Sequence, residues 1–158
     1  MINNKTGSGK VNTGKVISWL LVILWAGVIF YLSSRTADES TVQSRGMISS
    51  FAGFFGTVID NEELMINIDG IVRESAHGVE YFILGVLVCN ASGSAVLSLI
   101  LCMLYALSDE IHQIPIPGRA FQIMDLLIDF AGIVIGIVFL ICVKRFILRR
   151  RQRNACKE

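Results

Sequence analysis

Apolar residues gather in long stretches along the chain, separated by shorter polar segments. A bilayer core about 30 Å thick is crossed by roughly 20 apolar residues in a helix, and several of these stretches approach that length. The longest, residues 76–107, carries one charged residue, Glu80, and the turn-forming cluster at 90–94 divides it in two. The pattern therefore predicts four transmembrane helices, at 16–32 with an extension to 34, at about 73–89, at about 95–111 and at 123–143.

The connection between the first and second of these helices has a helical pattern of its own. Its apolar residues recur with helical period, and its other face carries few charges, which is typical of a helix lying at the membrane interface or half-inserted in it. Such a helix would be either a cover over the bundle or a gate. We therefore expect an all-α integral membrane protein with four transmembrane helices and an outer interfacial helix between the first and the second. The apolar positions are Ile48, Phe51, Ala52, Phe55, Val58 and Ile59.

Composition agrees with a membrane protein and excludes several other classes. The 158 residues suffice for one domain; they are 53% hydrophobic and only 17% charged, against roughly 25% charged in an average soluble domain. A water-soluble enzyme, a disordered chain and a fibrous chain are therefore excluded, and nothing indicates a nucleic-acid partner.

The basic residues predict the orientation. Three of the 14 Lys and Arg residues precede residue 16, seven follow residue 143, and four lie between. An even number of crossings puts both ends on one side, and the positive-inside rule makes that side the cytoplasm. Residues 33–74 and 108–122 then face outside. We expect a cytoplasmic tail at 1–15, a transmembrane domain at 16–143 and a basic cytoplasmic tail at 144–158.

Each tail has a second interpretation. The first apolar segment follows basic residues, as in a signal peptide, but no small-x-small cleavage site follows it, which favours an uncleaved anchor. The basic C-terminal tail is interpreted as a stop-transfer flank, with contact to anionic lipid as the alternative.

Ionisable residues inside apolar helices are costly, and they are therefore functional candidates. One group, on the second helix, is Arg73, His77, Glu80 and Tyr81, which share a helix face. In a purely structural role, these residues would only hold neighbouring helices together through polar contacts. As a site, His77 and Glu80 would be acid and base and Arg73 would hold an anion.

A second group ends the third helix and a third group begins the fourth. The second contains Asp109, Glu110, His112 and Gln113, followed by a Pro-Gly turn that directs Arg119. The third places two carboxylates on the same stripe as a Gly-x-x-x-Gly motif, which allows close approach of another backbone and indicates a stripe facing the bundle interior. Its residues are Asp125, Asp129, Gly132 and Gly136.

All three groups fall near the outer surface in the predicted topology, which suggests one outward-facing polar pocket. Arginines suit a phosphate or carboxylate, whereas the carboxylates suit an amine, a proton or a metal. The motifs HExxH, a Gly-rich phosphate loop and a Ser elbow do not occur, and we assign no metal, cofactor or catalytic residue. The expected pocket contains Arg73, His77, Glu80, Tyr81, Asp109, Glu110, His112, Gln113, Arg119, Asp125 and Asp129.

Three segments carry a resemblance to the VanZ-like family of bacterial membrane proteins. They are Phe-Tyr-Leu-Ser-Ser at 30–34, Arg-Glu-Ser-Ala-His-Gly-Val-Glu-Tyr-Phe-Ile-Leu-Gly at 73–85, and the stretch at 107–136 that contains Asp-Glu-Ile-His-Gln, Pro-Gly-Arg and the Asp-rich last helix. Many members have Arg-Lys where this chain has Arg73-Glu74, so a role that needs a dibasic pair is not expected here. The matching positions are His77, Tyr81, Asp109, Glu110, Gln113, Pro117, Gly118, Arg119, Asp125 and Gly132.

The resemblance implies an integral protein of the bacterial plasma membrane associated with low-level teicoplanin resistance; it implies no known reaction. With the pocket, it favours a protein that binds or modulates an envelope lipid, a lipid-linked envelope precursor or a lipoglycopeptide. The alternatives are a membrane enzyme acting on a lipid-linked phosphate or sugar at the outer leaflet, and a small ion-coupled transporter with relay sites at Glu80 and Asp129. In such an enzyme, the carboxylates could bind Mg²⁺ or Mn²⁺, or His77 and His112 could bind Zn²⁺.

Overall fold

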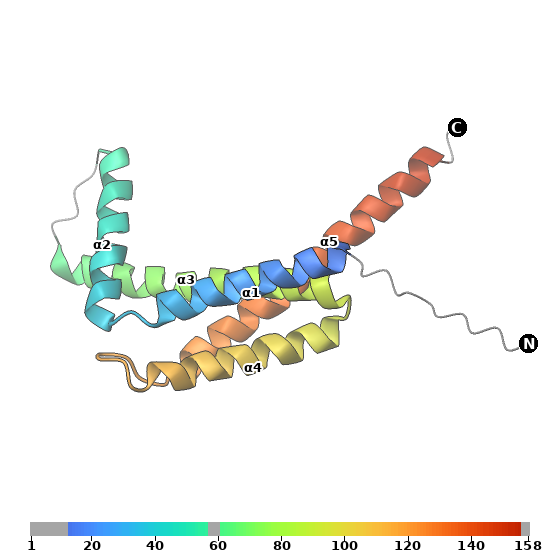
Figure 1. The fold of residues 1–158 in the computed structure, drawn as a ribbon. Helices are drawn as coiled ribbons and strands as arrows, with labels where there is room; N and C mark the ends of the chain where they lie inside the picture. Colours follow the sequence, from blue (N-terminus) through green and yellow to red (C-terminus); the bar gives the residue numbers. More distant parts are fainter. Residues whose placement is uncertain (1–12, 57–60, 156–158) are drawn as a thin grey trace, which may run out of the picture.

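The computed structural model describes residues 13–56 and 61–155, and all regular secondary structure in this part of the chain is α-helical (Figure 1). The predicted all-α class is confirmed. The helices are α1 (Thr13–Ser33), α2 (Ala37–Phe54), α3 (Glu62–Ser92), α4 (Ala95–Gln113) and α5 (Ile123–Ala155).

Four helices form a bundle, and α3 is its central member. It contacts α1, α4 and α5 within the bundle, most extensively α5, and it is also the helix that holds α2. Figure 1 shows α2 standing steeply away from one end of the bundle, beside the start of α3 and the loop between α4 and α5. The start of α1, the turn between α3 and α4, and the C-terminal part of α5 lie toward the other end.

The distribution of side chains is that of a protein surrounded by lipid. Large apolar side chains are exposed along the outer faces of α1, α4 and α5, for example Leu24, Leu104 and Ile135, each at least 60% exposed. Polar side chains such as Glu110 and Asp129 are instead buried inside the bundle. Within the described residues, three helices are long and apolar enough to span a membrane, namely α1, α4 and α5. The chain is thus a helical protein of the membrane type.

Helix α3 differs from its predicted extent at its beginning. It starts at Glu62 rather than near residue 73, because the Asn61 side chain accepts the backbone N–H of Leu64 and caps the helix. Its end agrees with the predicted turn at 90–94. Gly93, with φ of 74°, ends α3 in the left-handed conformation, and the Ser94 side chain caps α4.

The two other differences concern α2 and α5. The segment that was predicted to lie at the interface is helical from Ala37, where Thr36 and Glu39 form a capping box, to Phe54. The predicted apolar positions Val58 and Ile59 lie outside the described residues. Helix α5 does not end near residue 143, because the Lys and Arg residues that follow are good helix formers and extend it to Ala155.

Glycines bring α3 and α5 into backbone contact. A Cβ at Gly132 would collide with the carbonyl oxygen of Gly78, and one at Gly136 with that of Phe82. On the facing helix, a Cβ at Gly85 would lie 2.8 Å from the carbonyl oxygen of Ile133. The spacing of small residues therefore sets the distance between these helices, as is usual for helices in membranes.

Candidate functional site

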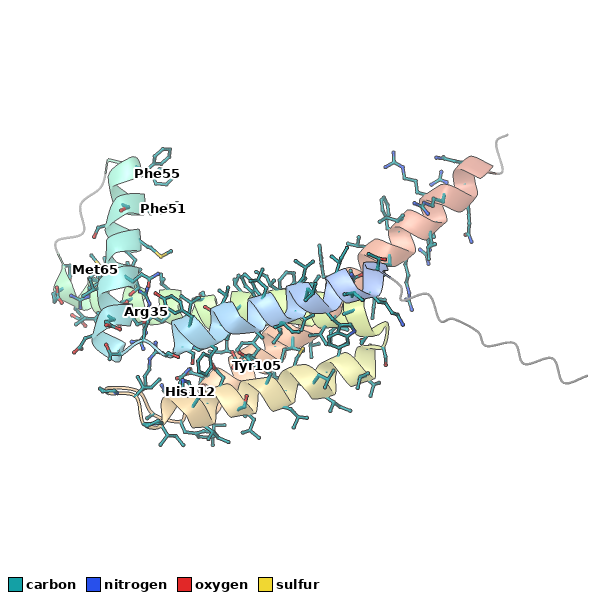
Figure 2. The ribbon with its side chains drawn as sticks, viewed as in Figure 1. Arg35, Phe51, Phe55, Met65, Tyr105 and His112 are labelled. Atoms are coloured by element: carbon teal, nitrogen blue, oxygen red, sulfur yellow. The ribbon has the colours of Figure 1, made fainter. Side chains whose placement is uncertain are left out.

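The polar groups of the sequence meet at the end of the bundle where α2 stands. Helix α3 contributes Arg73, His77 and Glu80 there, the α4–α5 loop contributes Arg119, and α5 contributes Asp125. Figure 2 shows Arg35 and His112 at this same end, whereas Phe51 and Phe55 lie further along α2.

A tight turn places Arg119. The backbone N–H of Arg119 donates to the carbonyl oxygen of Ile116 at 3.0 Å, with Pro117 and Gly118 at the central positions. Gly118 has φ of 74°, which a Pro-Gly turn requires and a residue with a side chain rarely adopts. The turn is also fixed to α2, since the N–H of Ala37 donates to the carbonyl oxygen of Pro117 at 3.2 Å.

The first of two cavities, which we name the arginine cavity, has a volume of about 140 Å³. Three arginines line it, Arg35, Arg73 and Arg119. The other ionisable groups in its wall are one acid, Glu80, and His77. Side chains from the α1–α2 region and from α3 close the rest of its wall, namely Leu32, Ser33, Ser40, Gln43, Ser44, Met47, Val72 and Ala76.

The second cavity, the mixed-charge cavity, has a volume of about 150 Å³ and shares three residues with the first. These shared residues are Arg73, His77 and Arg119, so they form the partition between the cavities. Two carboxylates, Glu74 and Asp125, balance the two arginines here, and Gly70 and Gln122 complete the lining.

Arg73 and Arg119 form no direct salt bridge with a carboxylate of the described residues. Burial, and after it the positive charge of Arg73, hold the pKa of Arg119 below its ordinary value, and the nearby Asp125 partly offsets this. Five of the eleven predicted pocket residues line these cavities, and the arginines keep their hydrogen-bonding capacity; the five are Arg73, His77, Glu80, Arg119 and Asp125.

A buried polar layer on α4 lies deeper in the bundle. The Gln113 amide donates to the Ser33 hydroxyl at 2.9 Å and, at 3.4 Å, to Asp109. Glu110 is fully buried and accepts the backbone N–H of Gln122 at 2.9 Å. The first contact joins α4 to the end of α1, and the second joins it to the start of α5.

His77, which lines both cavities, also lies close to a buried acid of α5, Asp129. His77 Nδ1 lies 3.7 Å from Asp129 Oδ1, and the Asp129 side chain is only 1% exposed. Several buried polar atoms here have no hydrogen-bond partner among the described residues, which is uncommon in a folded protein and leaves them available for a proton or a polar ligand. They belong to His77, Tyr81, Asp109, Glu110, Arg119 and Asp129.

Six predicted pocket residues line neither cavity: besides Tyr81, Asp109, Glu110, Gln113 and Asp129, they include His112. Its ring stacks on Phe30 with centroids 4.5 Å apart, and its Nε2 lies 3.1 Å from the Ser34 hydroxyl. It therefore binds α4 to α1 and lines neither cavity. Across residues 13–56 and 61–155, no three His, Cys, Asp or Glu side chains gather closely enough to hold a metal ion.

The structure adds site residues that the sequence did not single out. Arg35, Gln43 and Ser44 line the arginine cavity, and Arg35 is held there by hydrogen bonds to Gln43 at 2.7 Å and to Tyr31 at 3.0 Å. A usable signal existed for Arg35, which follows directly after the first apolar helix at the predicted outer surface. Gln43 and Ser44 carried no such signal, because their position depends on how α2 folds back against α3.

Comparison with known proteins identifies a family. The family described as VanZ/LLP1 matches residues 18–146, which include α3 and α4, most of α1 and α5, and all predicted pocket residues. No curated protein and no solved structure matches the chain. The family match extends over more than half of the sequence and confirms the resemblance found in its motifs. The chain belongs to the VanZ/LLP1 family.

Proposed function

We propose that this protein is a multi-pass protein of the bacterial plasma membrane that binds or modulates an envelope lipid, or a lipid-tailed glycopeptide, in an outward-facing polar pocket. The observation that carries the proposal is the pair of cavities that share Arg73, His77 and Arg119 at one end of the bundle. Charged groups are retained at membrane depth when something uses them.

The proposal includes four crossings, with α3 as the fourth. Its 31 residues extend over about 46 Å, more than a bilayer core requires. It contains more polar residues than α1, α4 and α5, but much of its C-terminal half is buried by those helices, for example Leu84 and Val88. A helix enclosed by three others tolerates polar residues because they face protein and not lipid.

The proposed orientation has both termini in the cytoplasm. The start of α1, with Lys15, and the basic end of α5, with residues such as Arg149, lie toward the same end of the bundle (Figure 1). The cavities lie toward the opposite end. By the positive-inside rule the basic end is cytoplasmic, so the cavities open to the outside.

Helix α2 is the proposed interfacial element. It crosses the bundle direction steeply (Figure 1), so that it would lie along the membrane surface if the bundle crosses the membrane. Met47, Phe51 and Phe54 are 61%, 69% and 83% exposed, which suits contact with the apolar side of the interface. A ligand entering from the outer leaflet would meet α2 before the cavities.

The test is mass spectrometry of lipids that copurify with the chain. We expect one lipid class to be enriched with the wild type and reduced with Arg119→Ala. A matched control is Arg45→Ala, because Arg45 pairs with Glu62 at 2.9 Å and lines neither cavity. If the two variants retain the same lipids as the wild type, the pocket does not select the ligand. Teicoplanin susceptibility of cells expressing the same variants shows whether the bound ligand matters for resistance.

Orientation is tested separately with a cysteine-free variant carrying one new cysteine. Ser49→Cys, exposed on α2, should react in intact cells with a membrane-impermeant thiol reagent. Arg153→Cys, exposed near the end of α5, should react only after the cells are opened. The reverse labelling would place the cavities in the cytoplasm and contradict the proposal.

A further inference from the structure

The arginine cavity has an excess of positive charge that the mixed-charge cavity does not have. Three arginines and one acid, Glu80, line the arginine cavity. In the mixed-charge cavity two acids accompany two of those arginines. The two cavities are nearly equal in volume, at about 140 and 150 Å³, so charge and not size distinguishes the ligands they suit. The arginine cavity suits an anion.

None of the three arginines of this cavity forms a salt bridge with a carboxylate of the described residues. Arg35 donates to neutral groups, Gln43 and the Tyr31 hydroxyl, and its guanidinium also lies 5.2 Å from the Tyr31 ring centroid. Neither Arg73 nor Arg119 forms an ion pair within the described part of the chain, and Arg119 Nε is buried there without a partner. Guanidinium groups present planar sets of donors that match phosphate oxygens. An anion bound between them would supply the missing acceptors.

The cavity is large enough for a phosphate group. One water molecule needs at least 10–15 Å³ of such space, so about 140 Å³ offers roughly ten water-sized positions. Ser40, Gln43 and Ser44 provide neutral polar surface beside the arginines.

An apolar groove continues from the cavity along α2. Gln43 and Met47 line both, and the groove proceeds past Gly46 and Ser50 to Phe51 and Phe54. Figure 2 shows Phe51 and Phe55 along the part of α2 that extends away from the bundle. A polar cavity that opens into an apolar groove fits a molecule with an anionic head and a hydrocarbon chain.

We propose that the ligand of this site is a phosphate-bearing lipid, with its phosphate between Arg35, Arg73 and Arg119 and its chain along the α2 groove. This inference rests on the proposed function and names the ligand class for the same pocket. The shared chemistry is the phosphate; free inorganic phosphate is the other source, and the experiment separates the two.

The experiment measures binding to the purified full-length chain in a non-ionic detergent, with three probes. Dioctanoyl phosphatidate carries both chain and phosphate, dioctanoylglycerol carries the chain alone, and inorganic phosphate carries the anion alone. We expect phosphatidate to bind at least tenfold more tightly than either of the others, and its affinity to fall as salt concentration rises. The salt dependence needs no variant, so it remains measurable if a substitution prevents folding.

Variants test where the phosphate and the hydrocarbon chain of the ligand bind. Arg73→Gln and Arg119→Gln should each weaken phosphatidate binding about tenfold, since each removes a charged hydrogen-bond donor, whereas Arg45→Gln should not. Phe51→Ser should weaken phosphatidate several-fold and leave inorganic phosphate unchanged. Val42→Ser is its control, because Val42 is 73% exposed on the same helix but lines neither the cavity nor the groove.

The results that would overturn the inference also show which proposal fails. If dioctanoylglycerol binds as tightly as phosphatidate, the site takes a lipid without using phosphate, and only this inference is wrong. If inorganic phosphate binds as tightly and Phe51→Ser has no effect, the site takes a free anion and the α2 groove is not part of it. If no probe binds and no lipid copurifies with the wild type, both this inference and the proposed function are wrong.

Discussion

The contact between α3 and α5 and the contact between α2 and α3 hold helices together in opposite ways. Along the first, Gly132 and Gly136 let the α5 backbone touch that of α3 over a long interface. The second is shorter and includes two polar contacts: the Ser44 hydroxyl donates to the buried Asp69 carboxylate, and Arg45 pairs with Glu62. The arginine cavity lies between elements of both kinds, with one wall on the rigid bundle and another on α2.

This difference indicates which part of the site is held less firmly. Elements with few buried apolar contacts open at lower free energy than a closely packed core. His77 and Asp129 belong to the closely packed helices, so their mutual distance is fixed by the glycine contacts. Gln43, Ser44 and Met47 belong to α2, so we expect this wall of the cavity to open at lower free energy than the wall formed by the bundle.

The largest effect on stability is expected from Gly136→Leu. A side chain there would collide with the carbonyl of Phe82, and separating two packed helices to relieve the collision costs their other contacts as well. We expect most of the folded, monodisperse protein to be lost in size-exclusion chromatography. Gly27→Leu is the control, since a Cβ at Gly27 meets no atom of the described chain within 4 Å. Equal yields from the two variants would show that the helices do not depend on this contact.

A smaller and local effect is expected from Ser44→Ala. The substitution leaves the buried Asp69 without its hydroxyl partner, which costs about 1–3 kcal/mol. Hydrogen–deuterium exchange should rise across α2 and stay unchanged in the glycine-rich parts of α3 and α5. Ser50→Ala is the control, because the exposed Ser50 hydroxyl bonds only to the Gly46 carbonyl of its own helix, at 2.8 Å. Faster exchange in α3 and α5 as well would mean that α2 supports the bundle.

Much of the bundle was predictable because lipid imposes a simple pattern on sequence. Apolar length located α1, α4 and α5, and the residues Gly93 and Ser94 lie where turn-forming residues had predicted a helical hairpin. The beginning of α3 was missed, because residues 62–72 mix charged, polar and apolar side chains and form no apolar run of membrane-spanning length. The helix starts there because Asn61 caps it, and α2 packs against it.

For the site, the sequence predicted which residues share a helix face. The spacing of Arg73, His77 and Glu80 placed them together, and all three line the arginine cavity. The same reasoning grouped His112 with Asp109 and Gln113. At a helix end the tertiary neighbours decide direction, and Phe30 and Ser34 draw His112 toward α1. Arg35 was missed because its role depends on the turn from α1 into α2, which no periodicity describes.

A still smaller effect on stability is expected from Glu62→Gln, which removes the charge that pairs with Arg45. The Glu62 side chain is 71% exposed, and ion pairs in such positions contribute about 0–1 kcal/mol. The thermal unfolding temperature should change little, and high salt should reduce the difference further. Glu63→Gln, exposed one residue away, serves as the control. A loss comparable to that of Ser44→Ala would mean that charge, and not the buried hydrogen bond, holds α2.

The smallest effect on stability, with a clear effect on binding, is expected from Asp125→Asn. Asp125 is half-buried on the rigid side of the site and lines the mixed-charge cavity, but it forms no hydrogen bond or ion pair within the described residues. Asn keeps its shape, so the thermal unfolding temperature should stay near that of the wild type. The substitution, however, removes a negative charge that partly offsets the positive charge of Arg119. An anion beside that arginine should therefore bind several-fold more tightly. Titration with dioctanoyl phosphatidate measures this effect, with Glu63→Gln again as the control for a lost charge on a residue that lines neither cavity. Weaker binding at unchanged stability would show that Asp125 holds Arg119 in position for the ligand instead of competing with it.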